Sequence, residues 1–313
     1  MRRHFRYHDL ASQDQGASVA IGNFDGVHLG HRAVIDRARA ASARLDCPLG
    51  VITFEPHPRA YFAPDAPPFR LMNAETRAHR LAKLAVDQLY ELPFDADLAA
   101  LPAERFVIEV LVEGLGVRHV VVGADFRFGT KRGGDVALLE KLGAEHGFSV
   151  EIAPLIGEGD TEFSSTAIRQ ALSEGDPRRA AQMLGHWHRI DGTVSKGDQR
   201  GRDLGFPTAN LTLEGLHLPR FGVYAVLFDV LTGPHQGSYL GAASLGVRPT
   251  FGVNAPNLET FVLDFKGDLY GADVSVALVE FIRPELSYEG AEPLIAQMND
   301  DVARIRRVLA ETA

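Results

Sequence analysis

Residues 22–31 constrain the fold of this chain more than any other stretch. They read Gly-Asn-Phe-Asp-Gly-Val-His-Leu-Gly-His, directly after a short apolar run and directly before an alanine- and arginine-rich pattern with helical spacing. The segment is therefore expected to connect a strand to a helix, with His28 and His31 at the start of the helix. Backbone N–H groups there favour anions, and Gly26 and Gly30 let a phosphate approach the main chain. A simple turn with histidines as incidental polar residues is the alternative interpretation.

The two histidines also predict a chemistry. An imidazole at this position can donate a hydrogen bond to a phosphate oxygen or to a leaving group. The sequence His28-Leu29-Gly30-His31 resembles the HxGH nucleotidyltransferases, which attack the α-phosphate of a nucleoside triphosphate and release pyrophosphate. The motif alone leaves the substrate open, because cytidylyltransferases and several adenylyltransferases share it.

The first part of the chain alternates strand and helix patterns. Strand-like runs occupy residues 19–21, 49–54, 119–123 and 149–152, and helical patterns occupy residues 32–45, 75–84, 102–111 and 135–146. This alternation predicts a parallel sheet with helices on both faces, in which ligands bind at the carboxyl ends of the strands. Polar and aromatic residues follow three of these strands, at 22–31, 54–58 and 123–129. We expect them to share one site.

A further segment, Phe-Ser-Ser-Thr-Ala-Ile-Arg at residues 163–169, begins another helix with hydroxyl groups. Serine and threonine are common N-cap residues, so a purely structural role is one interpretation. Ser165 and Thr166, with Arg169 one turn later, also suit a clamp for phosphates. The local sequence leaves both open.

The pattern changes near residue 185. Glycine-punctuated strand patterns follow at residues 190–194, 223–231, 239–245, 259–265 and 274–281, and the chain closes with an amphipathic helix at 291–309. Several strands without helices between them indicate an antiparallel sheet or barrel. The sequence thus predicts two domains, residues 1–184 and residues 185–313.

Composition limits the classes of partner. The net charge is −9, and neither half carries the basic excess typical of nucleic-acid binding. No apolar stretch approaches the roughly 20 residues of a membrane helix, so no membrane partner is expected. Cys47 is the single cysteine, which excludes an intramolecular disulfide and a multi-cysteine metal cluster. A cytoplasmic location is expected, and the sequence leaves the oligomeric state open.

A second candidate site lies in the β-rich part. Residues 196–210 are dense in glycine, charged and amide side chains, and a polar surface loop is the plainer interpretation of residues 196–205. Thr208 and Asn210 are two apart at the start of a strand, so their oxygens project to one face and can bind one Mg²⁺. Glu259 begins a later strand and could serve as a general base toward a hydroxyl nucleophile.

Together these pieces resemble the prokaryotic bifunctional riboflavin kinase/FAD synthetase family. The matching segments are GNFDGVHLGH, FEPHP, VGADFRFG, SSTAIR, GRDLGFPTAN, GVYAV, GVRPTF, LETFVLDF with LYG, and FIRPE, in that order. The resemblance implies a Rossmann-like HxGH nucleotidyltransferase domain followed by a small antiparallel β-barrel kinase domain with a C-terminal helix.

The resemblance also implies two ATP-dependent steps with Mg²⁺. In the kinase domain, riboflavin is phosphorylated to FMN, with Glu259 as base and Thr208 and Asn210 as metal ligands. In the first domain, FMN is adenylylated to FAD with release of pyrophosphate, assisted by His28 and His31. The other assigned residues are Gly22, Asn23, Phe24, Gly30, Ser165, Thr166, Arg169, Gly201, Arg202, Gly205 and Phe206 for ATP and phosphate, and Phe54, Pro56, His57, Asp125, Phe126 and Arg283 for flavin.

Three rival hypotheses remain at this point. A single-activity kinase with a degenerate first domain is disfavoured by the intact HxGH and SSTAIR segments. A flavin carrier without turnover would need neither Glu259 nor the metal ligands. A generic cytidylyltransferase leaves the second domain unexplained.

Overall fold

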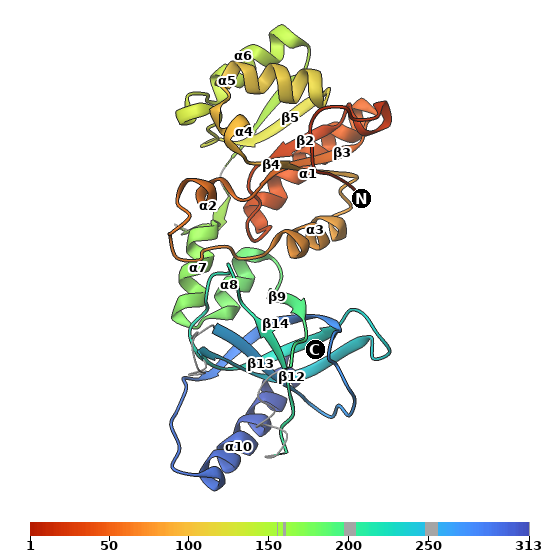
Figure 1. Ribbon diagram of the computed structural model, residues 1–313. Helices are drawn as coiled ribbons and strands as arrows, with labels where there is room; N and C mark the ends of the chain where they lie inside the picture. Colours follow the sequence, from red (N-terminus) through yellow and green to blue (C-terminus); the bar gives the residue numbers. More distant parts are fainter. Residues whose placement is uncertain (155, 159–160, 197–204, 248–255, 313) are drawn as a thin grey trace. The chain divides into compact units, whose positions relative to one another are not determined.

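The computed structural model describes residues 1–154, 156–158, 161–196, 205–247 and 256–312. The chain divides into two compact units (Figure 1). The first comprises Met1–Pro67 and Arg77–Phe163, and the second comprises Pro68–Thr76 and Ser164–Ala313. A short segment from within the N-terminal half therefore belongs to the second unit. The boundary at residues 184 and 185 stays a prediction.

A six-stranded parallel sheet forms the centre of the first unit. Its strand order is β1-β4-β3-β2-β5-β6, with every neighbouring pair parallel. The strands are β1 (Arg2–His4), β2 (Ser18–Ile21), β3 (Leu49–Glu55), β4 (Gln88–Pro93), β5 (His119–Gly123) and β6 (Ser149–Ala153). The helices are η1 (Ser12–Asp14), α1 (Leu29–Leu45), α2 (Pro58–Phe62), α3 (Ala74–Lys83), α4 (Ala96–Ala100), α5 (Ala103–Arg105), the π-helix η2 (Phe106–Gly114), η3 (Thr130–Arg132) and α6 (Val136–His146).

Helices cover both faces of this sheet, as the sequence predicts. Val19 and Ile21 of β2 pack in one core cluster with Phe106 and Val110 of η2, whereas Ala20 points to the other face because side chains alternate along a strand. On that opposite face, the buried Ser18 hydroxyl donates to the Ala38 carbonyl of α1 at 2.8 Å. The near-continuous burial of these strands is typical of a parallel sheet covered twice.

The strand order places a ligand-binding position at the end of β2. From β2 the chain moves outward to β3 and β4 on one side, and β5 and β6 lie on the other side. Neighbouring strands whose connections leave in opposite directions form a switch point, where open parallel sheets bind ligands. The switch point here lies between the carboxyl ends of β2 and β5. The segments 22–31 and 123–129 follow those two ends.

An antiparallel sheet of six strands dominates the second unit. Its order is β10-β13-β12-β11-β14-β9, and the edge strands approach each other through a bridge between Ser195 and Asn210. This sheet curls toward closure, which confirms the predicted barrel-like domain. The short paired strands β7 (Gly157–Glu158) and β8 (Thr161–Glu162) close the first unit. The elements that follow in the second unit are α7 (Ser165–Glu174), α8 (Pro177–Leu184), β9 (His188–Thr193), β10 (Thr208–Thr212), β11 (Gly222–Val230), β12 (Gly237–Val247), β13 (Pro256–Val262), β14 (Asp273–Arg283) and α10 (Ala291–Ala310).

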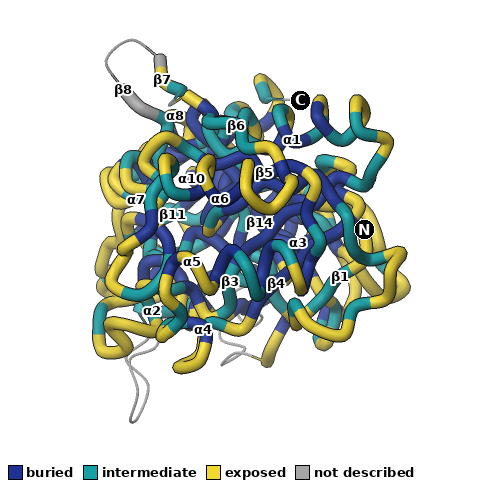
Figure 2. The backbone as a smooth tube through the Cα atoms, turned by 90° about the horizontal axis from the view of Figure 1, so that it is seen from above, coloured by how far each residue is buried: buried dark blue, intermediate teal, exposed yellow. Residues whose placement is uncertain are grey.

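The C-terminal helix α10 packs on the outside of the barrel sheet. Ile305 and Leu309 of α10 are buried with Ala225 and Val279, as expected of the predicted amphipathic helix at 291–309. In Figure 2 the strands β5 and β14 run largely buried, while much of the chain around α2 and α4 is exposed. In the described part of the chain, no helix has the length and apolarity needed to cross a membrane.

Candidate functional sites

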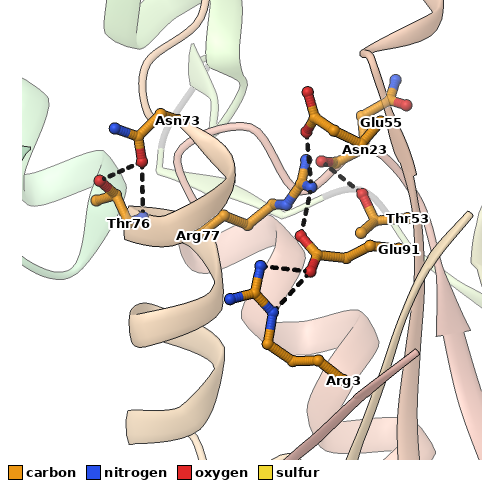
Figure 3. Close-up of polar contacts among 8 residues, drawn as sticks. All are labelled: Arg3, Asn23, Thr53, Glu55, Asn73, Thr76, Arg77 and Glu91. Atoms are coloured by element: carbon orange, nitrogen blue, oxygen red, sulfur yellow. Dashed lines mark hydrogen bonds and ion pairs between the residues drawn. The ribbon is translucent and has the colours of Figure 1, made fainter. Parts of the chain in front are cut away.

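The turn after β2 is tightly constrained. Phe24, Gly26 and Val27 have positive φ angles of 51°, 91° and 45°. Such values are rare for a β-branched residue, and outliers of this kind concentrate at functional sites. The Thr53 hydroxyl of β3 donates to the carbonyl oxygen of Asn23 at 3.2 Å, which ties the turn to the neighbouring strand (Figure 3).

His28 is the N-cap of α1. Its Nδ1 accepts a hydrogen bond from the backbone N–H of His31 at 3.3 Å. An accepting Nδ1 places the proton of the neutral ring on Nε2, which is therefore the donor of this imidazole. The sequence prediction of a histidine at the helix start is confirmed, and the cap orients its ring.

The two histidine rings stack face to face. Their centroids are 3.6 Å apart with an interplanar angle of 25°. A Cβ on Gly30 would lie 3.0 Å from the His28 ring and 3.1 Å from the Phe163 carbonyl oxygen, so a larger residue would fit only if the ring or the backbone shifted. Burial, and secondarily the nearby His28, holds the pKa of His31 well below its usual value, so His31 is neutral at pH 7. Nδ1 of His31 is buried without a hydrogen-bond partner among the described residues.

An aromatic cluster follows the end of β3. Phe94 makes edge contacts with Phe54, Tyr61 and Phe62, at centroid distances of 5.8, 5.4 and 5.7 Å. Phe62 is 68% exposed, so its ring is open to solvent. Sequence reasoning singled out Phe54 but missed Tyr61 and Phe62, although both follow the Phe-Glu-Pro-His-Pro segment within four residues of its end.

His57 has a structural role in this segment. Its Nδ1 accepts from the backbone N–H of Arg59 at 3.0 Å, which makes it the N-cap of α2, and Pro56 precedes it. At the end of β5, Asp125 is exposed, and Phe126 stacks on Phe128 at 5.4 Å. The flavin-binding assignments of these residues stay predictions.

Four charged side chains of alternating sign form a chain of ion pairs that reaches the end of β3 (Figure 3). Glu91 of β4 accepts from Arg3 at 2.8 and 2.7 Å and from Arg77 of α3 at 3.1 Å. Arg77 also donates to Glu55, the last residue of β3, at 3.0 Å. The side chains of Arg77 and Glu91 are each 1% exposed, so each carries its charge out of water and needs its partners. A cavity of about 440 Å³ lies beside β1 and η1, and none of the predicted site residues lines it.

The helix α7 begins with hydroxyl side chains, but its cap is Ser164. The Ser164 hydroxyl accepts from the backbone N–H of Ala167 at 3.2 Å. Ser165 and Thr166 are thus the first helical residues, and the Thr166 hydroxyl accepts from Arg169 at 3.3 Å. The cap is therefore Ser164, whereas the residues assigned to phosphate are Ser165, Thr166 and Arg169. A capping role and a phosphate-binding role for this segment are compatible.

The second candidate site lies on the paired strands β10 and β13. Their register places Asn210 opposite Glu259, and the Thr208 hydroxyl lies 3.5 Å from a Glu259 carboxylate oxygen. The amide nitrogen of Asn210 donates to the Thr208 carbonyl at 3.2 Å, and Asn257 donates to the other oxygen of Glu259 at 3.2 Å. The structure therefore brings together the three side chains that the sequence assigned to metal binding and base catalysis.

The remaining predicted kinase residues lie in different surroundings. Gly201 and Arg202 fall outside the described residues, and Gly205 is exposed with a φ of 84°. Phe206 is 8% exposed and packs edge-on against Phe261 of β13 at 5.0 Å.

Arg283 is held by the C-terminal helix. Its Nε and Nη2 donate to the Asp301 carboxylate of α10 at 2.9 and 2.7 Å, and its Nη1 donates to the Pro284 carbonyl at 3.0 Å. The Asp301 side chain is 7% exposed, so this ion pair fastens α10 to β14. Whether Arg283 also contacts flavin stays a prediction.

Oxygen donors dominate the candidate metal position. Within the part of the chain that the structure describes, no three His, Cys, Asp or Glu side chains gather as a ready metal centre. The hydroxyl of Thr208, the amide oxygen of Asn210 and the Glu259 carboxylate are hard ligands of the kind that Mg²⁺ shares with substrate phosphates.

Both halves of the chain match families of known proteins. The family model for FAD synthetase matches residues 10–167, and the model for riboflavin kinase matches residues 184–309. A bifunctional riboflavin kinase/FMN adenylyltransferase from Pseudomonas fluorescens is 40% identical over 307 residues, covering 98% of this chain and 97% of that protein. The protein of the same name from Escherichia coli K12 is 40% identical over 306 residues, covering 97% of each chain.

A solved structure has the same fold along its whole length. It is described as a macrolide-efflux protein from Streptococcus pneumoniae, and it matches with a TM-score of 0.84 and 28% identity over 97% of this chain and 98% of that chain. Both reactions predicted from the sequence have their own matching model, and the relatives that carry both names cover nearly the full chain. The chain therefore belongs to the bifunctional riboflavin kinase/FMN adenylyltransferase family, and it uses ATP to convert riboflavin to FMN and FMN to FAD.

Proposed function

We propose that the two reactions use different residues: Thr208, Asn210 and Glu259 serve the kinase reaction, and the segments with His28, His31 and Arg169 serve adenylylation. The observation that carries this assignment is the register of β10 and β13, which gathers Thr208, Asn210 and Glu259, while His28 and His31 belong to the other unit. A cytoplasmic location is part of the same proposal.

In the kinase reaction, Glu259 accepts the proton of the riboflavin 5′-hydroxyl as that oxygen attacks the γ-phosphate of ATP. The bond to ADP breaks, and FMN forms. Thr208 and Asn210 would hold Mg²⁺, which neutralises phosphate charge when bound. Phosphoryl transfer depends mainly on positioning and charge stabilisation, so loss of either oxygen donor should impair the reaction as much as loss of the base.

In the adenylylation reaction, a phosphate oxygen of FMN attacks the α-phosphate of a second ATP, and pyrophosphate leaves. The FMN phosphate is already anionic near pH 7, so this step needs no general base. His28 donates through Nε2 to the charge that accumulates on the α-phosphate and the leaving group. The neutral His31 stacks on His28 and keeps its ring in place. Ser165, Thr166 and Arg169 clamp the phosphates.

The solvent-exposed rings at the end of β3 support a flavin-binding role for this edge of the sheet. The exposed faces of Tyr61 and Phe62 are surfaces of the kind on which an isoalloxazine ring can stack, while Phe54 is half-buried. Tyr61, Phe62 and the capping residue His57 all lie in the segment that follows β3.

Two variants test the assignment in one assay. Purified protein receives riboflavin, ATP and Mg²⁺, and the flavins are separated by chromatography over time. His28→Ala should abolish FAD formation and leave FMN formation close to normal, whereas Glu259→Gln should block FMN formation and still convert supplied FMN to FAD. Loss of both activities in either folded variant would contradict this assignment.

A further inference from the structure

The barrel contributes hydrogen bonds to the carbonyl groups of α7. Nε2 of His217, in the loop between β10 and β11, lies 3.0 Å from the Arg169 carbonyl oxygen and 3.1 Å from the Ser173 hydroxyl. The backbone N–H of Arg220 donates to the Leu172 carbonyl at 2.9 Å. These contacts reach two successive turns of one helix.

The chemistry of these contacts identifies His217 as a donor. A carbonyl oxygen only accepts hydrogen bonds, so the proton of the His217 ring lies on Nε2. Burial lowers the pKa of His217, and the neutral ring keeps this donor at pH 7. Leu172 is among the last four residues of α7, whose carbonyls have no partner four residues further along the helix, so the Arg220 N–H helps to complete this end, while His217 adds a second hydrogen bond at the Arg169 carbonyl.

The same loop also binds the segment Pro68–Thr76. The backbone N–H of His217 donates to the Arg70 carbonyl at 2.8 Å, and Leu216 forms a parallel bridge with Arg70. One residue earlier, the Phe69 carbonyl accepts from the guanidinium of Arg169 at 3.3 Å, and that guanidinium lies 5.9 Å from the Phe69 ring. His217 therefore holds both the backbone of Arg169 and the segment that orients its side chain.

We propose that His217, a residue of the riboflavin kinase match, is a positioning residue for FAD synthesis. It fixes α7 and the Phe69–Arg70 backbone so that the guanidinium of Arg169 points where it can clamp the phosphates of ATP. This inference rests on the proposed role of Arg169. It assigns to a loop of the barrel a part in FAD synthesis.

The position of His217 separates it from the kinase chemistry. Thr208 and Asn210 lie at the start of β10, whereas the loop with His217 follows Thr212 at the other end. At roughly 3.3 Å per residue, the strand alone spans about 13 Å. Replacement of His217 is therefore expected to leave the kinase reaction unchanged, which provides an internal control in the same molecule.

Four full-length variants test the proposal: His217→Ala, His217→Gln, Arg169→Ala and His235→Ala. His235 is a matched control, because it lies on the β11–β12 hairpin against Phe265. For each variant, kcat and the KM for ATP are measured separately for adenylylation of supplied FMN and for phosphorylation of riboflavin. Glutamine keeps an N–H donor and serves as the conservative replacement.

In His217→Ala, kcat/KM for ATP in adenylylation should fall by about five- to tenfold, which corresponds to the loss of one hydrogen bond. Most of this fall should come from a higher KM. His217→Gln should recover part of it, His235→Ala should match the parent, and the KM for ATP in the kinase reaction should stay constant in all three. Unchanged adenylylation in His217→Ala with impaired Arg169→Ala would overturn the positioning role and leave the clamp intact. Unchanged adenylylation in Arg169→Ala would overturn both. A parallel fall of both activities in His217→Ala and His217→Gln would show a merely structural role.

Discussion

The buried charge chain of the first unit makes a quantitative prediction for Arg77→Met. The variant removes the donor that reaches Glu91 at 3.1 Å and Glu55 at 3.0 Å. A hydrogen bond between charged groups contributes about 1.5–3 kcal/mol, and Glu91, 1% exposed, has no water to replace it. The Glu55 side chain is 34% exposed, so loss of the ion pair between Arg77 and Glu55 costs only about 0.5 kcal/mol.

Two features reduce the cost. Methionine fills most of the volume of the arginine stem, and Nε of Arg77 is buried without a partner among the described residues, so its removal recovers about 1 kcal/mol. The net destabilisation is therefore about 2 kcal/mol. For a unit of this size, each kcal/mol lowers the melting temperature by about 2–4 °C, so a fall of roughly 4–8 °C is expected.

The assay can follow the two units separately. Trp187 is the single tryptophan and belongs to the second unit, so its fluorescence should report an unchanged transition. Far-ultraviolet circular dichroism should show the first unit melting earlier. Lys83→Met, at an exposed position near the end of the same helix, is the matched control and should stay within about 0.5 kcal/mol of the parent.

A double-mutant cycle decides whether the charges cause the effect. Glu91→Leu alone leaves Arg77 with only Glu55 among these carboxylates, whereas Arg77→Met combined with Glu91→Leu removes the buried pair together. Replacing a buried ion pair by apolar side chains is often close to neutral, so the double variant should be more stable than either single variant. Additive losses in the cycle, or a harmless Arg77→Met, would refute the reasoning.

Two further predictions concern the barrel. Arg283→Ala leaves the buried Asp301 carboxylate without its cation and should destabilise the packing of α10 by about 3–5 kcal/mol, visible as faster proteolysis of residues 291–310. Asp301→Asn loosens the helix but keeps Arg283, so a rise in the KM for riboflavin confined to Arg283→Ala would support direct flavin contact, and equal KM values would oppose it. Burial lowers the pKa of His188 to about 3. As the pH falls, His188 is therefore protonated near pH 6.5 in the unfolded chain but only near pH 3 in the folded barrel. Stability should therefore fall as the pH drops below about 6.5, by up to about 1.4 kcal/mol per unit, and His188→Gln should flatten this fall in urea titrations between pH 7 and 5; an identical slope in the variant would contradict the assignment.

Local patterns predict most of the fold because their information lies within a few residues. The helix and strand patterns of the first unit and all five later strand patterns correspond to observed elements. Strand β4 was missed because Gln88 and Glu91 interrupt its apolar run, and their partners, His4 and Arg3, come from β1 at the far end of the sequence. A buried charge is intelligible only once its distant partner is known.

The candidate sites show the same limit. The cap of His28 and the close approach at Gly30 follow from the spacing of the HxGH segment, and the pairing of Asn210 with Glu259 is consistent with their predicted cooperation. The carboxylate that accepts from Arg283 belongs to Asp301, 18 residues further along the chain, and no local signal connects the two. The inclusion of Pro68–Thr76 in the second unit depends on contacts with Leu216 and His217, which local patterns do not encode.

The divided second unit has a consequence for synthesis on the ribosome. Arg70 leaves the ribosome long before His217, whose backbone N–H is its partner in the folded unit. At about 5–20 residues per second, the roughly 150 residues between them take about 7–30 s to translate. The parallel sheet can form in that interval, but the Phe69–Arg70 backbone must wait for the barrel loop. The first unit is therefore the earlier folding product, and the order of translation delays the segment that directs Arg169 until the kinase half exists.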